Sequence, residues 1–176
     1  KGTDYMHDGA LRGRKTTLLR ILAGLEKADS GQIEGLEGLR ISMVFQEDRL
    51  CENLSASANI RLVRGKKPWG RDKKLEAKIS KAMAAVGLGG CEDQPVREFS
   101  GGMRQRTALL RALYSEWDVL FLDEPFKGLD EETKELVIEY TKKQCFGKTV
   151  IFVTHDRSEP GKWAADSLRC NKTSYK

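Results

Sequence analysis

The chain has 176 residues, 39% of them hydrophobic and 32% charged, and a net charge of +5. This length is that of one domain, and the apolar content is sufficient for a core and too high for a disordered tail. The longest apolar runs, at residues 119–122 and 150–153, are far shorter than the roughly 20 residues that a transmembrane helix needs. The amino terminus has neither an apolar signal core nor an Arg-rich amphipathic stretch, so we expect a cytoplasmic location.

The positive charge is concentrated between residues 61 and 81, which hold nine Lys and Arg residues against Asp72 and Glu76. A charge run on a helix is usually a solvated face, so we expect no nucleic-acid partner; a patch for nucleic acid or a membrane surface is the alternative. The cysteines form no CxxC pair and fit reduced thiols without a metal-binding role. They are Cys51, Cys91, Cys145 and Cys170.

Apolar residues alternate between helical and strand spacing along the chain. A helix is expected from Lys15, a strand at residues 41–45, and a helix with its apolar face at residues 75–86 that ends at Gly87. Ser100 caps a further helix, and another has its apolar face at residues 136–140. The runs at 119–122 and 149–153 are continuously apolar, which is typical of strands in a parallel sheet with helices on both faces. The sequence therefore predicts an α/β fold.

A phosphate-binding loop is the first candidate site. The stretch GALRGRKTT at residues 9–17 ends in Lys-Thr-Thr at a helix start, where free backbone N–H groups, the helix dipole and a lysine suit a phosphate. Gly9, Lys15 and Thr16 match the pattern GxxxxGKS/T, but Arg14 stands where the second glycine is expected. Taken alone, the segment fits a nucleotide loop and an ordinary basic helix start equally well.

Two further motifs point to phosphate chemistry. Asp123 and Glu124 follow the strand VLFL, at the sheet edge where open α/β proteins bind ligands, and two carboxylates there suit Mg²⁺ and a water molecule. Taken alone, such a pair is more often a polar strand end. The hexapeptide SGGMRQ at residues 100–105 opens a helix with two glycines, which leaves N–H groups and a hydroxyl free for an anion; this pattern is specific.

In chain order, GALRGRKTT, Gln46 after a strand, SGGMRQR, VLFLDEP, GLD and a strand-borne His155 resemble the motifs of the ATP-binding cassette (ABC) ATPases. The resemblance covers nearly the whole chain. It implies a P-loop NTPase-like parallel sheet in a single domain, residues 1–176, with a helical subdomain inserted at about residues 55–115. The run VFQEDRLCENLSASANI is most similar to the nitrate, sulfonate and taurine importer type.

The resemblance also implies a role for each motif residue. Lys15 would contact the β and γ phosphates of ATP, while Thr16, Gln46 and Asp123 would hold Mg²⁺ or its waters. Glu124 would act on the attacking water, and His155 would contact the γ-phosphate. Residues 100–102 would serve the nucleotide of a second subunit. The complete nucleotide-binding set is Gly9, Gly13, Arg14, Lys15, Thr16, Thr17, Gln46, Ser100, Gly101, Gly102 and Asp130, the last at the interface between subunits.

The partners implied by the resemblance follow from that arrangement. Two copies, or this chain and a paired second ATPase subunit, would pack head to tail around two ATP molecules, so that ATP binding and hydrolysis close and open the pair. This motion would be transmitted to transmembrane permease subunits that contact the chain near Gln46 and the helical subdomain. A solute-binding protein would be a further partner if the system is an importer. The expected location is cytoplasmic, at the inner face of the cell membrane.

Several features depart from the family pattern. Arg12 and Arg14 replace loop glycines, and we expect weakened ATP binding because their side chains disfavour the required backbone angles. TDYMHD at residues 3–8 alternates poorly for a core strand, and SLRCNKTSYK at residues 167–176 makes a poor final strand. Pro160 and Gly161 are expected to interrupt the last helix. The core is therefore expected to be incomplete at both ends.

The favoured function is that of a transporter ATPase subunit that hydrolyses ATP as a dimer. One alternative is a nucleotide-dependent interaction module with little or no turnover, because of Arg12 and Arg14. A second is a chromosome-maintenance ATPase, which shares the motifs. That class inserts long heptad coiled coils before the signature, and residues 55–98 contain no sustained heptads, so we regard it as disfavoured.

Overall fold

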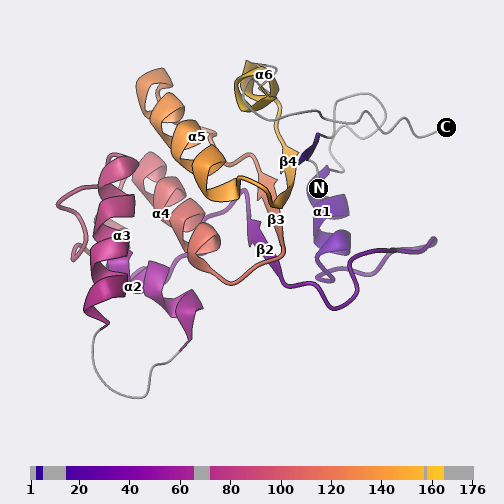
Figure 1. Cartoon of the computed structure of the whole chain (residues 1–176), viewed down its shortest axis with the longest axis horizontal. Coiled ribbons are helices and arrows are strands. Elements are labelled where there is room, and N and C mark those ends of the chain that lie inside the picture. The colour runs from indigo at the N-terminus through magenta and orange to yellow at the C-terminus, as the bar shows by residue number, and fades with distance from the viewer. Residues whose placement is uncertain (1–2, 6–14, 66–71, 157, 165–176) are drawn as a thin grey trace.

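A four-stranded parallel sheet forms the centre of the fold in the computed structural model, which describes residues 3–5, 15–65, 72–156 and 158–164 (Figure 1). The strands are β1 (Thr3–Tyr5), β2 (Ile41–Val44), β3 (Val119–Asp123) and β4 (Thr149–Val153), in the spatial order β1-β4-β3-β2. In this register Met43 lies beside Phe121, which lies beside Ile151. All described strands therefore end at one edge, and the residues that follow them meet there.

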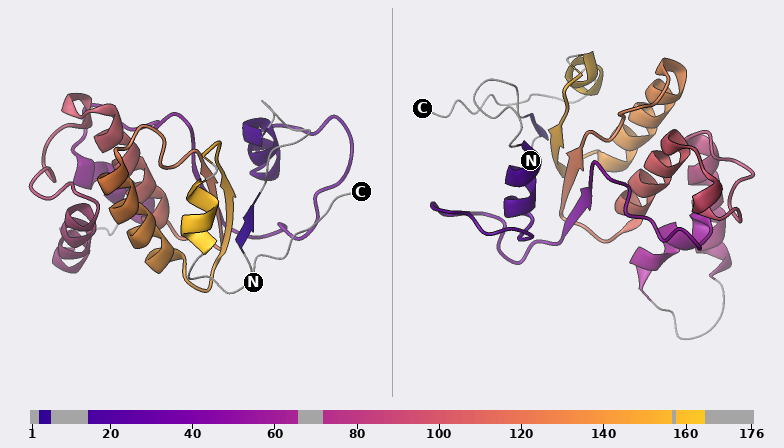
Figure 2. Two further views of the ribbon diagram at one scale, coloured as in Figure 1. Left: turned by 90° about the horizontal axis from the view of Figure 1, so that it is seen from above. Right: turned by 180° about the vertical axis from the view of Figure 1, so that it is seen from behind.

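Helices cover both faces of the sheet, as the continuous apolar runs predicted. Helix α1 (Lys15–Leu22) packs on one face, where buried Leu19 meets Val119, Phe121 and Val153. Helices α4 (Gly101–Tyr114), α5 (Glu131–Cys145) and α6 (Ser158–Ala164) cover the other face (Figure 2). Alternate strand residues such as Leu122 and Phe152 point into this second core.

A helical layer lies beyond α4, away from the sheet (Figure 1). It contains α2 (Ala56–Arg61), α3 (Lys73–Ala85) and single 3-10 turns at Leu62–Arg64 and Val96–Glu98. Buried Ile60, Ile79 and Met83 join it to Leu109 of α4 in one core. All of these elements come between β2 and β3 in the chain.

The predicted helix signals at Gly87 and Ser100 are confirmed. Gly87 has φ +72°, its N–H donates to Ala84 O, and the next N–H, that of Leu88, donates to Met83 O. A left-handed glycine with these two hydrogen bonds commonly ends a helix. A residue with a side chain would be strained at position 87 because of the positive φ. Ser100 precedes α4, and its side chain accepts a hydrogen bond from Met103 N at 3.3 Å.

The expectations for the two ends of the fold need correction. Residues 3–5 do form a strand, three residues long, which pairs in parallel with β4. The prediction that Pro160 and Gly161 interrupt the last helix is wrong, because α6 runs through both. Pro160 lies in the first turn, where a helical N–H has no intrahelical acceptor to lose, and buried Trp163 anchors the helix beside Phe152. Residues 167–176 lie outside the described part of the chain.

We found no membrane-spanning helix in the described ranges: none of their helices combines the length and the apolar character needed to cross a bilayer, and the longest, α5, has 15 residues.

Candidate functional site

A buried lysine lies at the carboxyl edge of the sheet. Lys15, the first residue of α1, is only 5% exposed, and its Nζ donates to the carbonyl oxygen of Thr154 at 3.4 Å. An ammonium group has three N–H donors, and in the described residues this one long contact is the only hydrogen bond it makes. The chemistry of the group therefore calls for an additional acceptor, such as an anionic ligand.

A hydroxyl and a carboxylate meet next to this lysine. Thr16 Oγ1 donates to Asp123 Oδ2 at 2.7 Å, although the two residues are 107 positions apart in the sequence. Asp123 is 1% exposed at the end of β3, so its carboxylate is held in place by the sheet. Thr17, the next residue of α1, is exposed, while Gly9, Gly13 and Arg14 of the predicted loop lie outside the described residues.

Glu124 has an unusual backbone and an unsatisfied side chain. Its φ is +51°, its N–H donates to Val153 O at 2.9 Å, and its carbonyl accepts from Gln105 Nε2 at 3.3 Å. Glu124 Oε1 is buried and lies 3.3 Å from His155 Nε2, yet it accepts no aligned hydrogen bond from any described group. Left-handed backbone at a non-glycine residue costs about 1–3 kcal/mol and concentrates at functional sites.

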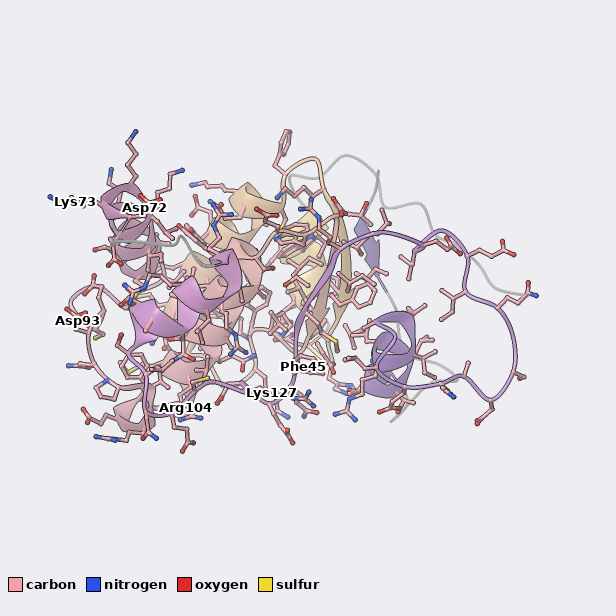
Figure 3. All side chains as sticks on the ribbon, turned by 90° about the horizontal axis from the view of Figure 1, so that it is seen from below. Phe45, Asp72, Lys73, Asp93, Arg104 and Lys127 are labelled. Carbon is pink, nitrogen blue, oxygen red and sulfur yellow. The ribbon has the colours of Figure 1, made fainter. Side chains whose placement is uncertain are left out.

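Two adjoining pockets open beside these groups. One, of about 410 Å³, is lined by Thr16, Arg20, Phe45, Gln46, Glu47, Arg49 and Lys127. The other, of about 540 Å³, is lined by Gln46, Glu47, Asp48, Arg49, Gly101, Gly102, Arg104, Gln105, Lys127 and Gly128. Figure 3 shows Phe45 and Lys127 close together between α1 and the helical layer, with Arg104 farther toward that layer. Gln46, which is exposed, lines both pockets, as do Glu47, Arg49 and Lys127.

The serine-glycine motif forms a separate part of the site. Gly101 and Gly102 line the larger pocket, whereas the Ser100 hydroxyl is engaged as the cap of α4. A Cβ at position 102 would come within 3.2 Å of Leu129 Cδ2, so a glycine suits this close approach. The structure thus brings Lys15, Thr16, Asp123, Glu124 and His155 to one sheet edge, and it presents residues 101 and 102 next to Gln46.

The oxygen groups present fit a magnesium ion. Thr16 and Asp123 offer a hydroxyl and a carboxylate in mutual contact, and Gln46 shares a pocket with Thr16. Across the described ranges, no three His, Cys, Asp or Glu side chains gather as a metal cage. Mg²⁺ is commonly held by one or two protein oxygens together with substrate phosphates, so this small donor set suits it.

Asp130 caps α5 and gives a pH-dependent contribution to stability. Its Oδ1 accepts from Thr133 N at 2.9 Å, and this hydrogen bond lowers the pKa of the Asp130 carboxyl below its usual value. A lowered carboxyl pKa stabilises the fold above the unfolded value of about 4, and the contribution is lost as the pH falls through the folded pKa. Asp130→Ser keeps a capping side chain but removes its charge. We therefore expect the melting temperature of this variant to fall less than that of wild type between about pH 6 and about pH 3. Equal losses would contradict this.

Sequence reasoning missed several residues that line the pockets, among them Arg49 and Lys127. Arg49 has φ +48°, and its guanidinium lies 4.0 Å from the ring centroid of Phe45. Lys127 borders both pockets. The only signal in the sequence was their position, within three residues of Gln46 or Glu124 at the ends of β2 and β3.

This combination of a lysine-threonine helix start and acidic strand ends is typical of phosphate-binding α/β proteins. A family model described as ABC transporter matches residues 13–127, more than half of the chain, and the chain belongs to this family as an ATP-binding cassette. The resemblance read from the motifs is therefore confirmed.

The chain is similar to curated import subunits and to a solved cassette. It is 39% identical over 160 residues to the sulfate/thiosulfate import ATP-binding protein CysA of Xanthomonas campestris, covering 82% of this chain and 46% of that protein. It is 38% identical over 149 residues to the aliphatic sulfonates import ATP-binding protein SsuB 1 of Pseudomonas savastanoi, covering 82% and 59%. The dimeric structure of the ATP-binding cassette MJ0796 bound to ADP and Pi gives a TM-score of 0.73 at 26% identity, covering 90% and 76%.

These matches confirm the predicted fold class, a P-loop NTPase-like parallel sheet with helices. A relative named for sulfonate import is among them, as the VFQEDRL segment predicted, beside one named for sulfate and thiosulfate. The chain spans about half the length of the CysA relative that it matches.

Proposed function

We propose that the chain binds and hydrolyses ATP as the energy-supplying subunit of a membrane importer. The observation that carries the proposal is the contact between Thr16 and Asp123 beside the under-coordinated Lys15 and the unsatisfied Glu124. A phosphate chain would satisfy the lysine, and a water molecule would satisfy the carboxylate. The named import function of the relatives supports a role in uptake rather than export.

The residues act on ATP in separate roles. Lys15 binds the β and γ phosphates, and Gly9, Gly13, Arg14 and Thr17 complete the loop around them. Thr16, Gln46 and Asp123 hold Mg²⁺, which when bound neutralises negative charge on the phosphate oxygens. Glu124 accepts a proton from the water whose oxygen attacks the γ-phosphorus, while the bond to the bridging oxygen of ADP breaks. His155, 3.3 Å from Glu124, contacts the γ-phosphate and keeps the carboxylate in place.

The domain and its partners follow from the same proposal. Residues 1–176 form one ATP-binding unit with a helical subdomain at about residues 55–115, located between β2 and β3. Ser100, Gly101, Gly102 and Asp130 face the nucleotide of a second copy or a paired ATPase subunit. Permease subunits bind near Gln46 and the helical layer, and a solute-binding protein delivers the cargo to them. The chain acts at the inner face of the cell membrane.

Phosphate release by the purified chain tests the proposal. We expect Mg²⁺-dependent release of phosphate from ATP, abolished by chelation of the metal, and ATP-dependent dimers in sedimentation. Nucleotide binding without any phosphate release would contradict the proposal and favour the interaction module with little or no turnover. No observation favours that alternative now, since Arg12 and Arg14 lie outside the described residues.

A further inference from the structure

Two arginines of α4 hold the turn that follows Gln46. Arg104 Nε donates to Asp48 Oδ2 at 2.7 Å, and its Nη2 donates to Asp48 Oδ1 at 3.0 Å, which makes a two-pronged pair. Arg111 donates from Nη2 to Asp48 O at 2.9 Å and from Nη1 to Arg49 O at 2.8 Å. The two arginines are seven residues apart, about two helical turns, so they reach from the same face of α4.

The pair between Arg104 and Asp48 is partly shielded from water. Their side chains are only 20% and 22% exposed. Burial alone would raise the pKa of the Asp48 carboxyl, but hydrogen bonds from Arg104 and from Leu50 N outweigh it and lower this pKa. Both partners are therefore charged at neutral pH, and a two-pronged arginine-carboxylate contact of this kind fixes orientation as well as distance.

The turn is strained and needs such support. Arg49 has φ +48°, a conformation that persists at a non-glycine residue only when its surroundings enforce it. Its carbonyl is held by Arg111, and its side chain lies over Phe45 and borders both pockets. The contacts from α4 thus fix a backbone geometry that the sequence of the turn disfavours by itself.

The support matters for Gln46 because its own side chain has no anchor. In the described part of the chain, its amide makes no hydrogen bond, and the residue is exposed between the two pockets. Its direction is therefore set by the backbone on either side. That backbone is fixed on one side by β2, which ends at Val44, and on the other by the turn at Asp48.

We propose that Arg104 and Arg111 are positioning residues that aim Gln46 at the metal and phosphates. This inference rests on the proposed function. The same helix that presents Gly101 and Gly102 at its first turn would then also determine where Gln46 lies, so that the two halves of the larger pocket move together.

The test uses Arg104→Gln and Arg111→Gln, with Arg40→Gln as the matched control. Arg40 also forms a two-pronged pair, with Asp118 at 3.1 Å for both contacts, but it lies before β2 at the opposite sheet edge. We expect the Mg²⁺ concentration for half-maximal phosphate release to rise about tenfold in the α4 variants and kcat to fall by a similar factor, with little change in KM for ATP. Arg104→Lys keeps the positive charge but cannot form the two-pronged contact, so its loss of activity should be only partly smaller than that of Arg104→Gln.

Hydrogen exchange gives a readout that needs neither ATP nor metal. Leu50 N donates to Asp48 Oδ1, so its exchange reports on the turn, whereas the neighbouring Cys51 N donates to Asn59 Oδ1 and serves as the internal reference. We expect faster exchange at Leu50 and unchanged exchange at Cys51 in Arg104→Gln. Wild-type exchange together with wild-type Mg²⁺ dependence would overturn the inference. A wild-type chain that releases no phosphate would overturn the proposed function instead, and the exchange result would still decide whether α4 holds the turn.

Discussion

Replacement of Glu124 by glutamine is expected to stop phosphate release while ATP still binds. The amide has nearly the same shape as the carboxylate but cannot accept the proton of the attacking water, and loss of a general base costs about 10²–10⁴-fold in rate. The expectation is motivated by the buried Oε1 of Glu124, which has no hydrogen-bond partner among the described residues. Steady-state phosphate release and nucleotide titration of Glu124→Gln, measured side by side, test the expectation. Because hydrolysis would no longer open the pair, we also expect dimers that persist in Mg-ATP.

The control is Glu132→Gln, which changes an exposed glutamate in the first turn of α5. It should release phosphate at the wild-type rate. If Glu124→Gln retained more than about a tenth of wild-type activity, general-base catalysis by this residue would be excluded. If it remained monomeric in saturating Mg-ATP, the shared nucleotide site between two copies would be excluded.

Replacement of Lys15 by methionine should remove ATP binding without destabilising the fold. Methionine keeps most of the length and volume of the side chain, and the ammonium that it removes has only the Thr154 carbonyl as a hydrogen-bond acceptor in the described structure. Loss of a buried charge contact to phosphate should weaken ATP affinity at least about a hundredfold. Loss of an under-paired buried charge should leave the melting temperature unchanged or raise it.

Fluorescent nucleotide titration and thermal unfolding without nucleotide measure the two effects. Lys73→Met, on the exposed surface of α3, is the control and should bind ATP as wild type does. Unfolding of Lys15→Met at a much lower temperature would mean that the lysine is a structural residue. Unchanged ATP affinity would remove the phosphate-binding role of this helix start.

The regular parts of the fold were predictable because local signals and packing agree. β3 and β4 are continuously apolar in the sequence, and they are the buried central strands of the described sheet. The cap at Ser100 and the helix end at Gly87 depend on a few adjacent residues, so a single sequence is sufficient to find them. The path of α6 was missed because Pro160 was treated as a helix breaker without regard to its place in the first turn.

The site was predictable only as far as strand ends determine it. Asp123 ends one of two neighbouring parallel strands, and Glu124 and His155 lie just beyond the ends of the two, so the sheet brings all three to one edge. The contact between Arg104 and Asp48 was not predictable, because the two residues are 56 positions apart and nothing in the SGGMRQ motif indicates which residue Arg104 would meet. The left-handed backbone of Arg49 was equally hidden, since it results from contacts with α4 rather than from a preference of arginine.

The left-handed conformation at Glu124 limits which residues could ever replace it. The peptide groups on both sides are fixed, one by Val153 of β4 and the other by Gln105 of α4. A residue branched at Cβ would collide with its own carbonyl in this conformation, so valine, isoleucine and threonine are unfavourable there for steric reasons alone. Glycine, asparagine and aspartate would accept the angles but would shorten or remove the acid. Few substitutions at position 124 would therefore preserve both the backbone conformation and the position of the carboxylate.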